Sequence, residues 1–239
     1  MEEIKVNAVM LRATDYLEND KILTLFTAER GKITVGIKGV KKAGAKLKFA
    51  AQPFCFAEYI LAVRSGRYTV INASENESFY DLRSDVMKLY AASASCEAVA
   101  ALTEEGDNDS ELFSFLIRTL SHMCNNDESE ALVAFLLKAL ECSGYKVTVG
   151  DCAECGKSLI GEDKMRFSMD KGAFTCFDCG AGVGVSGSTY NALRKACNLS
   201  YDKELALGGV KRALKLLYAY TVNKTEAKLS SLEQYINLL

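Results

Sequence analysis

Four cysteines in two closely spaced pairs place the strongest constraint on the fold of this chain. They follow the pattern C-x2-C-x20-C-x2-C and comprise Cys152, Cys155, Cys176 and Cys179. Two residues between thiolates let one turn direct both sulfurs at the same ion, and we expect Gly156 and Gly180 to take the positive φ that such turns require. The spacing therefore predicts one structural Zn²⁺ ion held by all four cysteines.

Two other interpretations of these cysteines are a pair of disulfides and a redox-active C-x-x-C motif. The redox motif needs a βαβ context, which the flanking Gly150 and Gly156 do not suggest. Four thiolates would fill a tetrahedral shell and leave no position for an activated water, so the predicted metal contributes to folding and does not hydrolyse a substrate.

The remaining cysteines indicate the compartment. The total of nine is odd, and Cys55 lies between two phenylalanines, where a thiol behaves as a small hydrophobe. The N-terminus lacks a basic start followed by an apolar core, and no run of eighteen apolar residues follows. We therefore expect a soluble, cytoplasmic protein.

Basic residues are concentrated in one segment of an otherwise acidic chain. The 239 residues carry a net charge of −2, but positions 30–70 hold nine basic residues against Glu58 alone, so this segment carries +8 and the remainder −10. Such a patch is typical of contact with nucleic-acid phosphates, although a solubilising surface is the alternative. The predicted DNA-binding residues are Arg30, Lys32, Lys38, Lys41, Lys42, Lys46, Lys48, Arg64 and Arg67.

The first eighty residues predict strands. Apolar residues alternate with polar ones, and turn residues such as Asn19-Asp20 and Ser65-Gly66 separate the runs. The predicted strands cover 3–13, 20–27, 31–39, 54–63 and 67–74. Five short strands favour a closed OB-fold barrel, with an SH3-like barrel as the rival.

Beyond position 80 the apolar period becomes helical. We expect a long amphipathic helix over 80–102, a second over 110–124, and a third over 128–143 that Asp127 caps. Ser188 is predicted to cap a fourth, Asp202 a fifth, and 229–238 forms the last. The expected class is α+β: an OB-fold domain over 1–79, then an all-α helical domain over 80–239 with a four-cysteine, zinc-finger-like insertion at 148–186.

Some weaker patterns are set aside. Gly39 to Lys46 lacks the spacing and hydroxyl of a Walker motif, and Gly182 to Gly187 is interpreted as a glycine linker.

Phe49, Phe54, Tyr59 and Tyr68 lie near the lysines in sequence and would stack on bases or, more commonly, belong to the core. The single histidine, His122, is interpreted as a structural or surface residue of a helix, and the carboxylates form no recognisable acid and base pair, so we expect no enzyme.

The chain resembles the RecO recombination mediators, bacterial DNA repair proteins. The resemblance is carried by Tyr16, Glu18, Asp20, Ile22 to Thr27, Glu29, Gly31 to Ile33, Lys38-Gly39, Lys46-Leu47 and Gln52 to Phe54, and it continues through the helices and the four cysteines. It implies an N-terminal OB-fold, a helical domain and a zinc-finger-like insertion.

The same resemblance implies a function. Members of this family bind single- and double-stranded DNA, anneal complementary strands, and work with RecR to load RecA onto DNA coated by single-strand binding protein. The helical domain is implied to bind the acidic C-terminal tail of that protein, and a nucleoid-associated location follows. The alternatives are a zinc-containing nucleic-acid enzyme and a scaffold that does not bind DNA.

Overall fold

The N-terminal strands close into a barrel. The computed structural model describes residues 2–197 and 208–239. Its first five strands are β1 (Glu2–Tyr16), β2 (Asp20–Thr27), β3 (Gly31–Ile37), β4 (Phe56–Arg64) and β5 (Arg67–Glu77). They follow the order β1-β2-β3-β5-β4, with β4 returning to β1 and β3 running parallel to β5. This is the OB-fold arrangement, so the predicted barrel class is confirmed.

Two strands are longer than predicted because pairing, and not polarity, decides where they end. β1 pairs with β4 over its first half and with β2 over its second, and a register shift between Met10 and Arg12 bends it between the two partners. The polar end of β5 also stays in the sheet, because Glu75 and Glu77 pair with β4.

Alternate residues of the strands fill the barrel. Leu23, Val35 and Leu61 are buried in one core cluster, which a short 3-10 helix (Phe49–Ala51) helps to close. The Tyr59 hydroxyl lies inside this core and donates a hydrogen bond of 2.9 Å to the carbonyl of Ala50. Burial of these side chains removes apolar surface from water and stabilises the barrel.

The helical domain begins with a break that the sequence pattern did not predict. The expected single helix over 80–102 is wrong: α1 (Asp81–Ser84) and α2 (Val86–Leu102) are separated at Asp85, whose backbone is extended. The Asp85 carboxylate accepts hydrogen bonds from the amides of Met87 and Lys88 and so caps α2.

Helix α2 is the centre of the bundle and not an amphipathic surface helix. Its buried residues occupy several faces and are mostly small, including Ala91, Ala94 and Ala98. It packs against α3 (Ser110–Asn125), α4 (Glu128–Cys142) and α7 (Ser230–Leu238). Alanine lets neighbouring helices approach closely. Because such helices pack on several sides of α2, its apolar residues are not confined to one face. Asp127 caps α4, as predicted.

The four-cysteine region carries a small sheet between α4 and α5 (Gly187–Ala196). Its strands are β6 (Lys164–Ser168), β7 (Ala173–Cys176) and β8 (Val183–Ser186), in the order β7-β6-β8. The interpretation of 182–187 as a glycine linker is therefore wrong, because most of it forms β8. Ser186, and not Ser188, caps α5 by accepting a hydrogen bond from the Thr189 amide.

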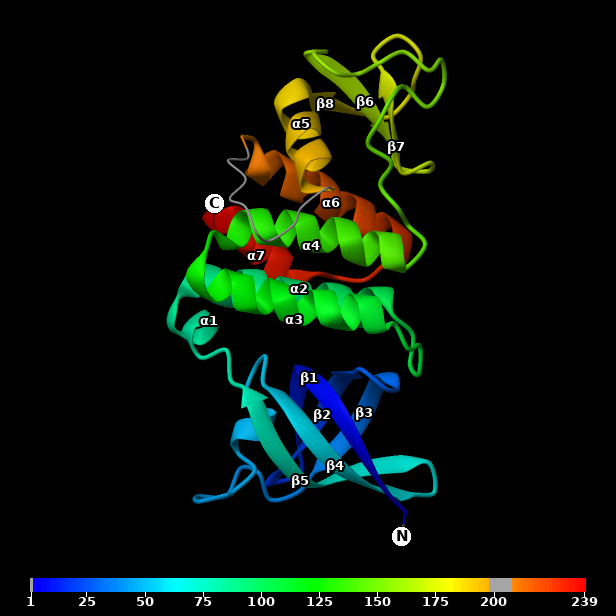
Figure 1. Ribbon diagram of the computed structural model, residues 1–239. Coiled ribbons are helices and arrows are strands. Elements are labelled where there is room, and N and C mark those ends of the chain that lie inside the picture. The colour runs from blue at the N-terminus through cyan, green and yellow to red at the C-terminus, as the bar shows by residue number, and fades with distance from the viewer. Residues whose placement is uncertain (1, 198–207) are drawn as a thin grey trace.

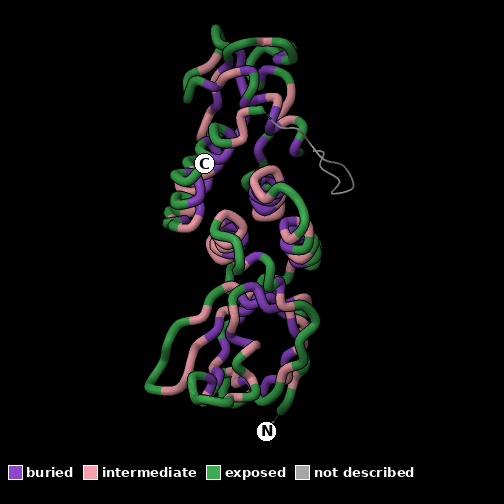
Figure 2. The backbone as a smooth tube through the Cα atoms, turned by 90° about the vertical axis from the view of Figure 1, so that its left-hand side faces the viewer, coloured by how far each residue is buried: buried purple, intermediate pink, exposed green. Residues whose placement is uncertain are grey.

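The last helices complete the bundle. α6 (Val210–Thr225) contacts α4 and α5, and α7 contacts α2 and α6. The predicted cap at Asp202 lies outside the described residues. Figure 1 shows the barrel at one end, the helices in the middle and the small sheet at the other end. Buried segments run through all three levels (Figure 2).

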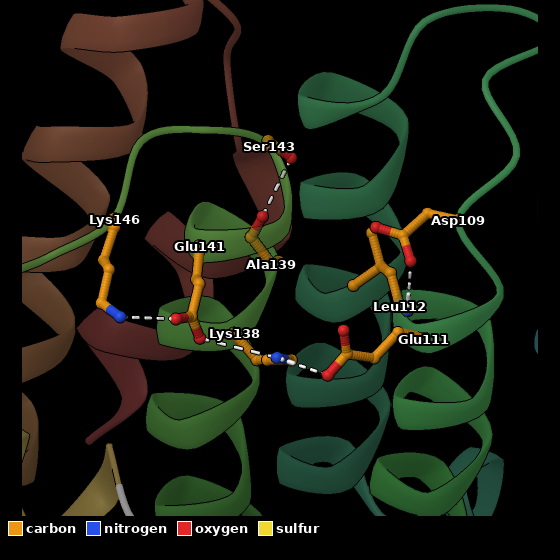
Figure 3. A network of polar contacts seen from close by, with 8 residues as sticks. All are labelled: Asp109, Glu111, Leu112, Lys138, Ala139, Glu141, Ser143 and Lys146. Atoms are coloured by element: carbon orange, nitrogen blue, oxygen red, sulfur yellow. Dashed lines mark hydrogen bonds and ion pairs between the residues drawn. The ribbon is translucent and has the colours of Figure 1, made fainter.

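A polar network fastens α3 to α4. The Lys138 ammonium lies 2.7 Å from the Glu111 carboxylate and 3.5 Å from that of Glu141, and Lys146 contacts Glu141 at 2.7 Å (Figure 3). The Asp109 carboxylate caps α3 by accepting from the Leu112 amide at 2.8 Å. Lysines on this face are thus paired with carboxylates of the same chain. Among the described residues, no helix is long and apolar enough to span a membrane.

Candidate metal centre and nucleic-acid interface

The fold brings the four predicted metal ligands together. The sulfurs of Cys152, Cys155, Cys176 and Cys179 all lie within 4.8 Å of one another. Cys155 Sγ and Cys176 Sγ are 3.9 Å apart, and a tetrahedral centre of one zinc and four sulfurs, with bonds of about 2.3 Å, requires sulfurs about 3.8 Å apart. None of the nine cysteines forms a disulfide. The four thiols therefore fit one metal ion.

Backbone amides prepare the cluster for a cation. The amide of Cys176 donates to Cys152 Sγ at 3.2 Å. Hydrogen bonds from the backbone of Cys155 and Cys176 lower the pKa of Cys152 to about 6, which favours the thiolate that metals bind. Hydrogen bonds with Cys176 and Cys155, followed by burial and by the charges of the same two cysteines, raise the pKa of Cys179 to about 12.

The thiols outside the cluster differ from these. Burial raises the pKa of Cys55 to about 11 and that of Cys96 to about 12. Both are therefore neutral thiols at physiological pH, and both are almost completely buried in apolar cores. This agrees with their interpretation as small hydrophobes.

The two glycines that follow the cysteine pairs have different functions. Gly156 has a φ of 73°, as predicted. The prediction for Gly180 is wrong: it is not among the residues of positive φ. A Cβ at Gly180 would lie 1.9 Å from Thr175 Oγ1. Gly180 is required because the second turn packs closely on β7, and a sequence pattern alone does not distinguish the two requirements.

The lysine-rich loop after β3 lies at the end of the barrel away from the helices (Figure 1). Its backbone is held against the β1–β2 turn, because the Gly39 amide donates to Asp20 Oδ1 at 2.8 Å and the Lys41 amide to the Asn19 carbonyl at 3.0 Å. Five exposed lysines result from this placement: Lys38, Lys41, Lys42, Lys46 and Lys48. The loop is thus a fixed surface and not a free tail.

Within the described part of the chain, one of these lysines has a carboxylate partner. Lys41 Nζ lies 2.9 Å from Asp15 Oδ2, and this hydrogen bond lowers the pKa of Asp15. Among the described residues, the other four lysines of the loop have no carboxylate within ion-pair distance. Their charges are therefore free to attract an external anion.

Arg64 and Arg67 face each other across the β4–β5 turn and are exposed. Ile37 pairs with Val70 in the parallel β3–β5 register, so Lys38 is four residues further along the strand direction than Arg67. At about 3.3 Å per residue, the two positions are about 13 Å apart in that direction. The β4–β5 turn that carries both arginines lies at the same end of the barrel as the lysine loop (Figure 1). We call the seven residues of this end the distal basic surface: Lys38, Lys41, Lys42, Lys46, Lys48, Arg64 and Arg67.

The structure does not place Arg30 and Lys32 on the distal basic surface. Lys32 Nζ donates to the carbonyl of Ala100 at 2.6 Å and to that of Thr103, at the C-terminus of α2. Burial lowers the pKa of Lys32, opposed by the nearby carboxylate of Glu105. Arg30 lies in the adjacent turn. Lys32 therefore joins the barrel to the helices and is not available to a phosphate.

The aromatic residues near the lysines are mostly core residues. Phe54 and Tyr59 are buried, and Phe49 and Tyr68 are half-buried against the barrel core. The exposed ring at this end is that of Tyr16, with 51% of its surface accessible. Tyr16 was named above only for the family resemblance and was not predicted to belong to the interface, because its strand was expected to end before it.

Leu17 adds to the same surface. It is 72% exposed, has a φ of 52°, and lines a shallow depression together with Lys38 and Lys42. A leucine in a polar turn, next to a tyrosine, was the sequence signal that could have identified this position. The barrel end thus offers both cations and an exposed aromatic ring, the two groups that hold single-stranded nucleic acid.

The fold and the site define a protein with an OB-fold barrel, a helical bundle and a cluster of four cysteines that could hold a metal ion. Residues 1–78 match the family model described as Recombination protein O N terminal, and residues 83–233 match Recombination protein O C terminal. These two models cover most of the chain. The chain therefore belongs to the RecO family of DNA repair proteins.

Curated relatives agree with this assignment. The chain is 36% identical to the DNA repair protein RecO of Alkaliphilus metalliredigens over 179 residues, or 74% of this chain and 72% of the relative. It is 33% identical to that of Clostridium perfringens over 208 residues, or 85% and 83%. The protein of Desulfitobacterium hafniense is also 33% identical, over 204 residues, or 82% and 74%.

Proposed function

We propose that this protein is a non-enzymatic recombination mediator that binds single- and double-stranded DNA through the distal basic surface. It anneals complementary strands and, with RecR, helps load RecA onto DNA coated by single-strand binding protein, whose C-terminal tail docks on the helical domain. The DNA-binding domain covers 1–79, the helical domain 80–239 and the metal-binding insertion 148–186. The protein works in the cytoplasm on nucleoid DNA.

The observation that carries the proposal is that no described carboxylate forms an ion pair with Lys38, Lys42, Lys46 or Lys48, although Glu18 and Asp20 line the same depression as Lys38 and Lys42. Other lysines, such as Lys138 and Lys146, contact carboxylates. A group of fixed, unpaired cations neutralises phosphates of a nucleic-acid backbone and releases its condensed counterions. Because phosphates are common to all sequences, this surface binds DNA without sequence preference and serves strand annealing.

The four cysteines support a structural Zn²⁺ ion in this scheme. The ion would be held by Cys152, Cys155, Cys176 and Cys179, and it would fix the small sheet against α5 and α6. A hydrolytic zinc site needs an open coordination position, whereas this cluster offers four thiolates. This favours the mediator over a zinc-containing nuclease.

The test is a matched pair of lysine variants. In the first, Lys38, Lys42 and Lys46 are changed to alanine. In the control, Lys157, Lys164 and Lys171, which are exposed near the cysteine cluster, are changed in the same way. Single-strand binding, annealing and strand cleavage are measured for both, at equal ionic strength.

We expect the loop variant to lose affinity by about tenfold or more at low salt, and annealing with it, while the control keeps both. No variant cleaves DNA, with or without Zn²⁺. Equal binding by both variants would contradict the proposed surface and favour a scaffold. Cleavage that depends on the metal would favour the enzyme.

A further inference from the structure

A crevice lies where the barrel meets the helical bundle. Its volume is about 700 Å³, and its walls come from the first two strands, the segment that precedes β4, helix α2 and the linker between α6 and α7. Pockets of about 300–1,000 Å³ hold small ligands, so this space is large enough for a nucleotide. It is too small for a double helix, whose major groove alone is about 12 Å wide.

The irregularity in β1 places a cation in this crevice. Met10 pairs with Leu25 and Arg12 with Thr24, so Leu11 is the extra residue of a bulge. In a regular strand Met10 and Arg12 would share a face, because side chains alternate. Here Met10 is buried in the barrel core, whereas Arg12 is exposed and lines the crevice. Bulges often redirect a side chain in this way beside a functional site.

The charges that line the crevice are mostly positive. Lys228, in the linker between α6 and α7, is a second exposed cation, and neither it nor Arg12 has a described carboxylate within ion-pair distance. Lys21 adds a third cation, which has an ion-pair partner on β1. Among the lining residues the carboxylate is that of Glu97, which accepts hydrogen bonds of 2.8 Å from the amide and the hydroxyl of Ser231. The crevice therefore favours an anionic ligand.

The outer face of β1 connects the crevice to the distal basic surface. Arg12, Thr14 and Tyr16 alternate along the strand and are all exposed, so they lie on the same side of it. At about 3.3 Å per residue, Arg12 and Tyr16 are about 13 Å apart, the length of about four stacked nucleotides. Lys41 of the lysine loop contacts Asp15, next to Tyr16. A strand held by the loop therefore reaches the crevice within the roughly 4–16 nucleotides that an OB-fold binds.

We propose that the crevice between barrel and bundle holds one nucleotide of a bound single strand, with Arg12 and Lys228 on its phosphate. The base would lie against the half-buried side chains of Leu11 and Ala101, which removes apolar surface from water. The inference rests on the proposed function, because it extends the DNA contact beyond the distal basic surface.

The crevice gives the protein a means to distinguish single strands from duplexes. The lysine loop neutralises phosphates, which both forms of DNA carry, so the loop binds both. A nucleotide can enter the crevice only when it is free of a complementary strand, because the space does not admit a double helix. Arg12 and Lys228 therefore increase the affinity for single strands alone.

Two matched pairs of variants test the proposal. Arg12→Ala with Lys228→Ala removes both free cations, and its control is Lys164→Ala with Lys211→Ala, two exposed lysines that do not line the crevice. Ser93→Arg adds a cation to the α2 wall, and Ser114→Arg, exposed on α3 outside the crevice, is its control. The second pair predicts a gain of affinity, which a damaged fold would not produce. Thermal unfolding verifies that each variant is folded.

Fluorescence anisotropy with the full chain measures affinity for single strands of about 6 and about 16 nucleotides and for a duplex of about 16 base pairs. We expect the Arg12 and Lys228 variant to bind the long single strand about fivefold more weakly at low salt. Its slope of log affinity against log salt should fall by about 1.4, which is two contacts at about 0.7 each. Affinities for the short strand and the duplex should change by about twofold or less, and Ser93→Arg should raise the affinity for the long strand about twofold to threefold.

Two results would overturn the crevice and leave the proposed function in place. One is equal binding of the long single strand by the Arg12 and Lys228 variant and its control, while the lysine-loop variant is impaired. The other is an equal loss of affinity for the single strand and the duplex, which would make the two cations general phosphate contacts. Failure of the wild-type protein to bind any of the three DNAs would instead contradict the proposed function itself.

Discussion

Lysines have different surroundings on two surfaces of the molecule, the α3–α4 face and the distal basic surface. On the α3–α4 face, Lys138 and Lys146 lie against carboxylates of their own chain (Figure 3). On the distal basic surface, Lys38, Lys42 and Lys46 have no such partner in the described structure. Net charge does not separate these cases. The positions of the carboxylates do, and they distinguish lysines that hold the fold together from lysines available to a ligand.

This comparison predicts a double dissociation. Changes among the satisfied groups of the helical and cysteine regions should alter stability and leave DNA binding intact. Changes on the distal basic surface should alter DNA binding and leave stability intact.

The largest effect is expected at the proposed metal site. Cys176→Ser removes one thiolate, and because metal binding supplies folding free energy, several kcal/mol of local stability should be lost. Amide hydrogen exchange should then show that the amides of β6, β7 and β8 have lost their protection. Metal analysis of the same variant should give less than one metal ion per chain. Cys142→Ser, outside the cluster, is the control. A loss of DNA affinity in Cys176→Ser, but not in Cys142→Ser, would contradict the separation of stability from DNA binding.

Lys32 tests the boundary between the two regions. Lys32→Met keeps the apolar stem but leaves the carbonyls of Ala100 and Thr103 without their donor, at a cost of about 1–3 kcal/mol in the free energy of unfolding. Urea titration measures this. Arg30 is a neighbouring exposed residue, and Arg30→Ala should lower the free energy of unfolding by about 0.5 kcal/mol or less. A stable Lys32→Met protein with weakened DNA binding would return Lys32 to the interface.

Asp15 offers a gain of affinity. Asp15→Asn removes a negative charge and frees Lys41 from its ion pair, so single-strand affinity should rise about twofold to fivefold at low salt. Glu141→Gln, which frees Lys146 on the α3–α4 face, should leave affinity unchanged. An equal increase in both variants would mean that total charge matters and position does not.

The smallest effect is expected for Lys138→Ala. Its partners Glu111 and Glu141 are largely solvent-exposed, so the loss in unfolding free energy should be about 1 kcal/mol or less. DNA affinity should not change. Chemical denaturation and anisotropy on the same preparation measure both quantities. A clear loss of affinity would place the α3–α4 face within the DNA footprint.

The sequence predicted those parts of the structure that local pattern determines. Alternating apolar residues specified the barrel strands, and cysteine spacing specified the cluster at Cys152 to Cys179. The pattern did not show that Asp85 interrupts a helix, because an aspartate on a helix surface and an aspartate cap look alike without the neighbouring backbone. It also did not show that 182–187 forms β8, since short glycine-rich strands lack the usual side-chain signal.

The candidate interface was predictable in part for a related reason. Charge counting found the lysine loop, but it also included Lys32, whose role depends on a helix terminus about seventy residues later in the chain. Tyr16 was missed because its exposure follows from the length of β1, which pairing with β2 determines. Long-range pairing is the information that composition and periodicity lack.

The most direct test of the central claim is the salt dependence of single-strand affinity. The slope of log affinity against log salt counts the phosphates neutralised, at about 0.7 per contact for a single strand. We expect that changing Lys38, Lys42 and Lys46 to alanine lowers this slope by about 2, while the Lys157, Lys164 and Lys171 control keeps the wild-type slope. Equal slopes for the two variants would contradict DNA binding through the distal basic surface.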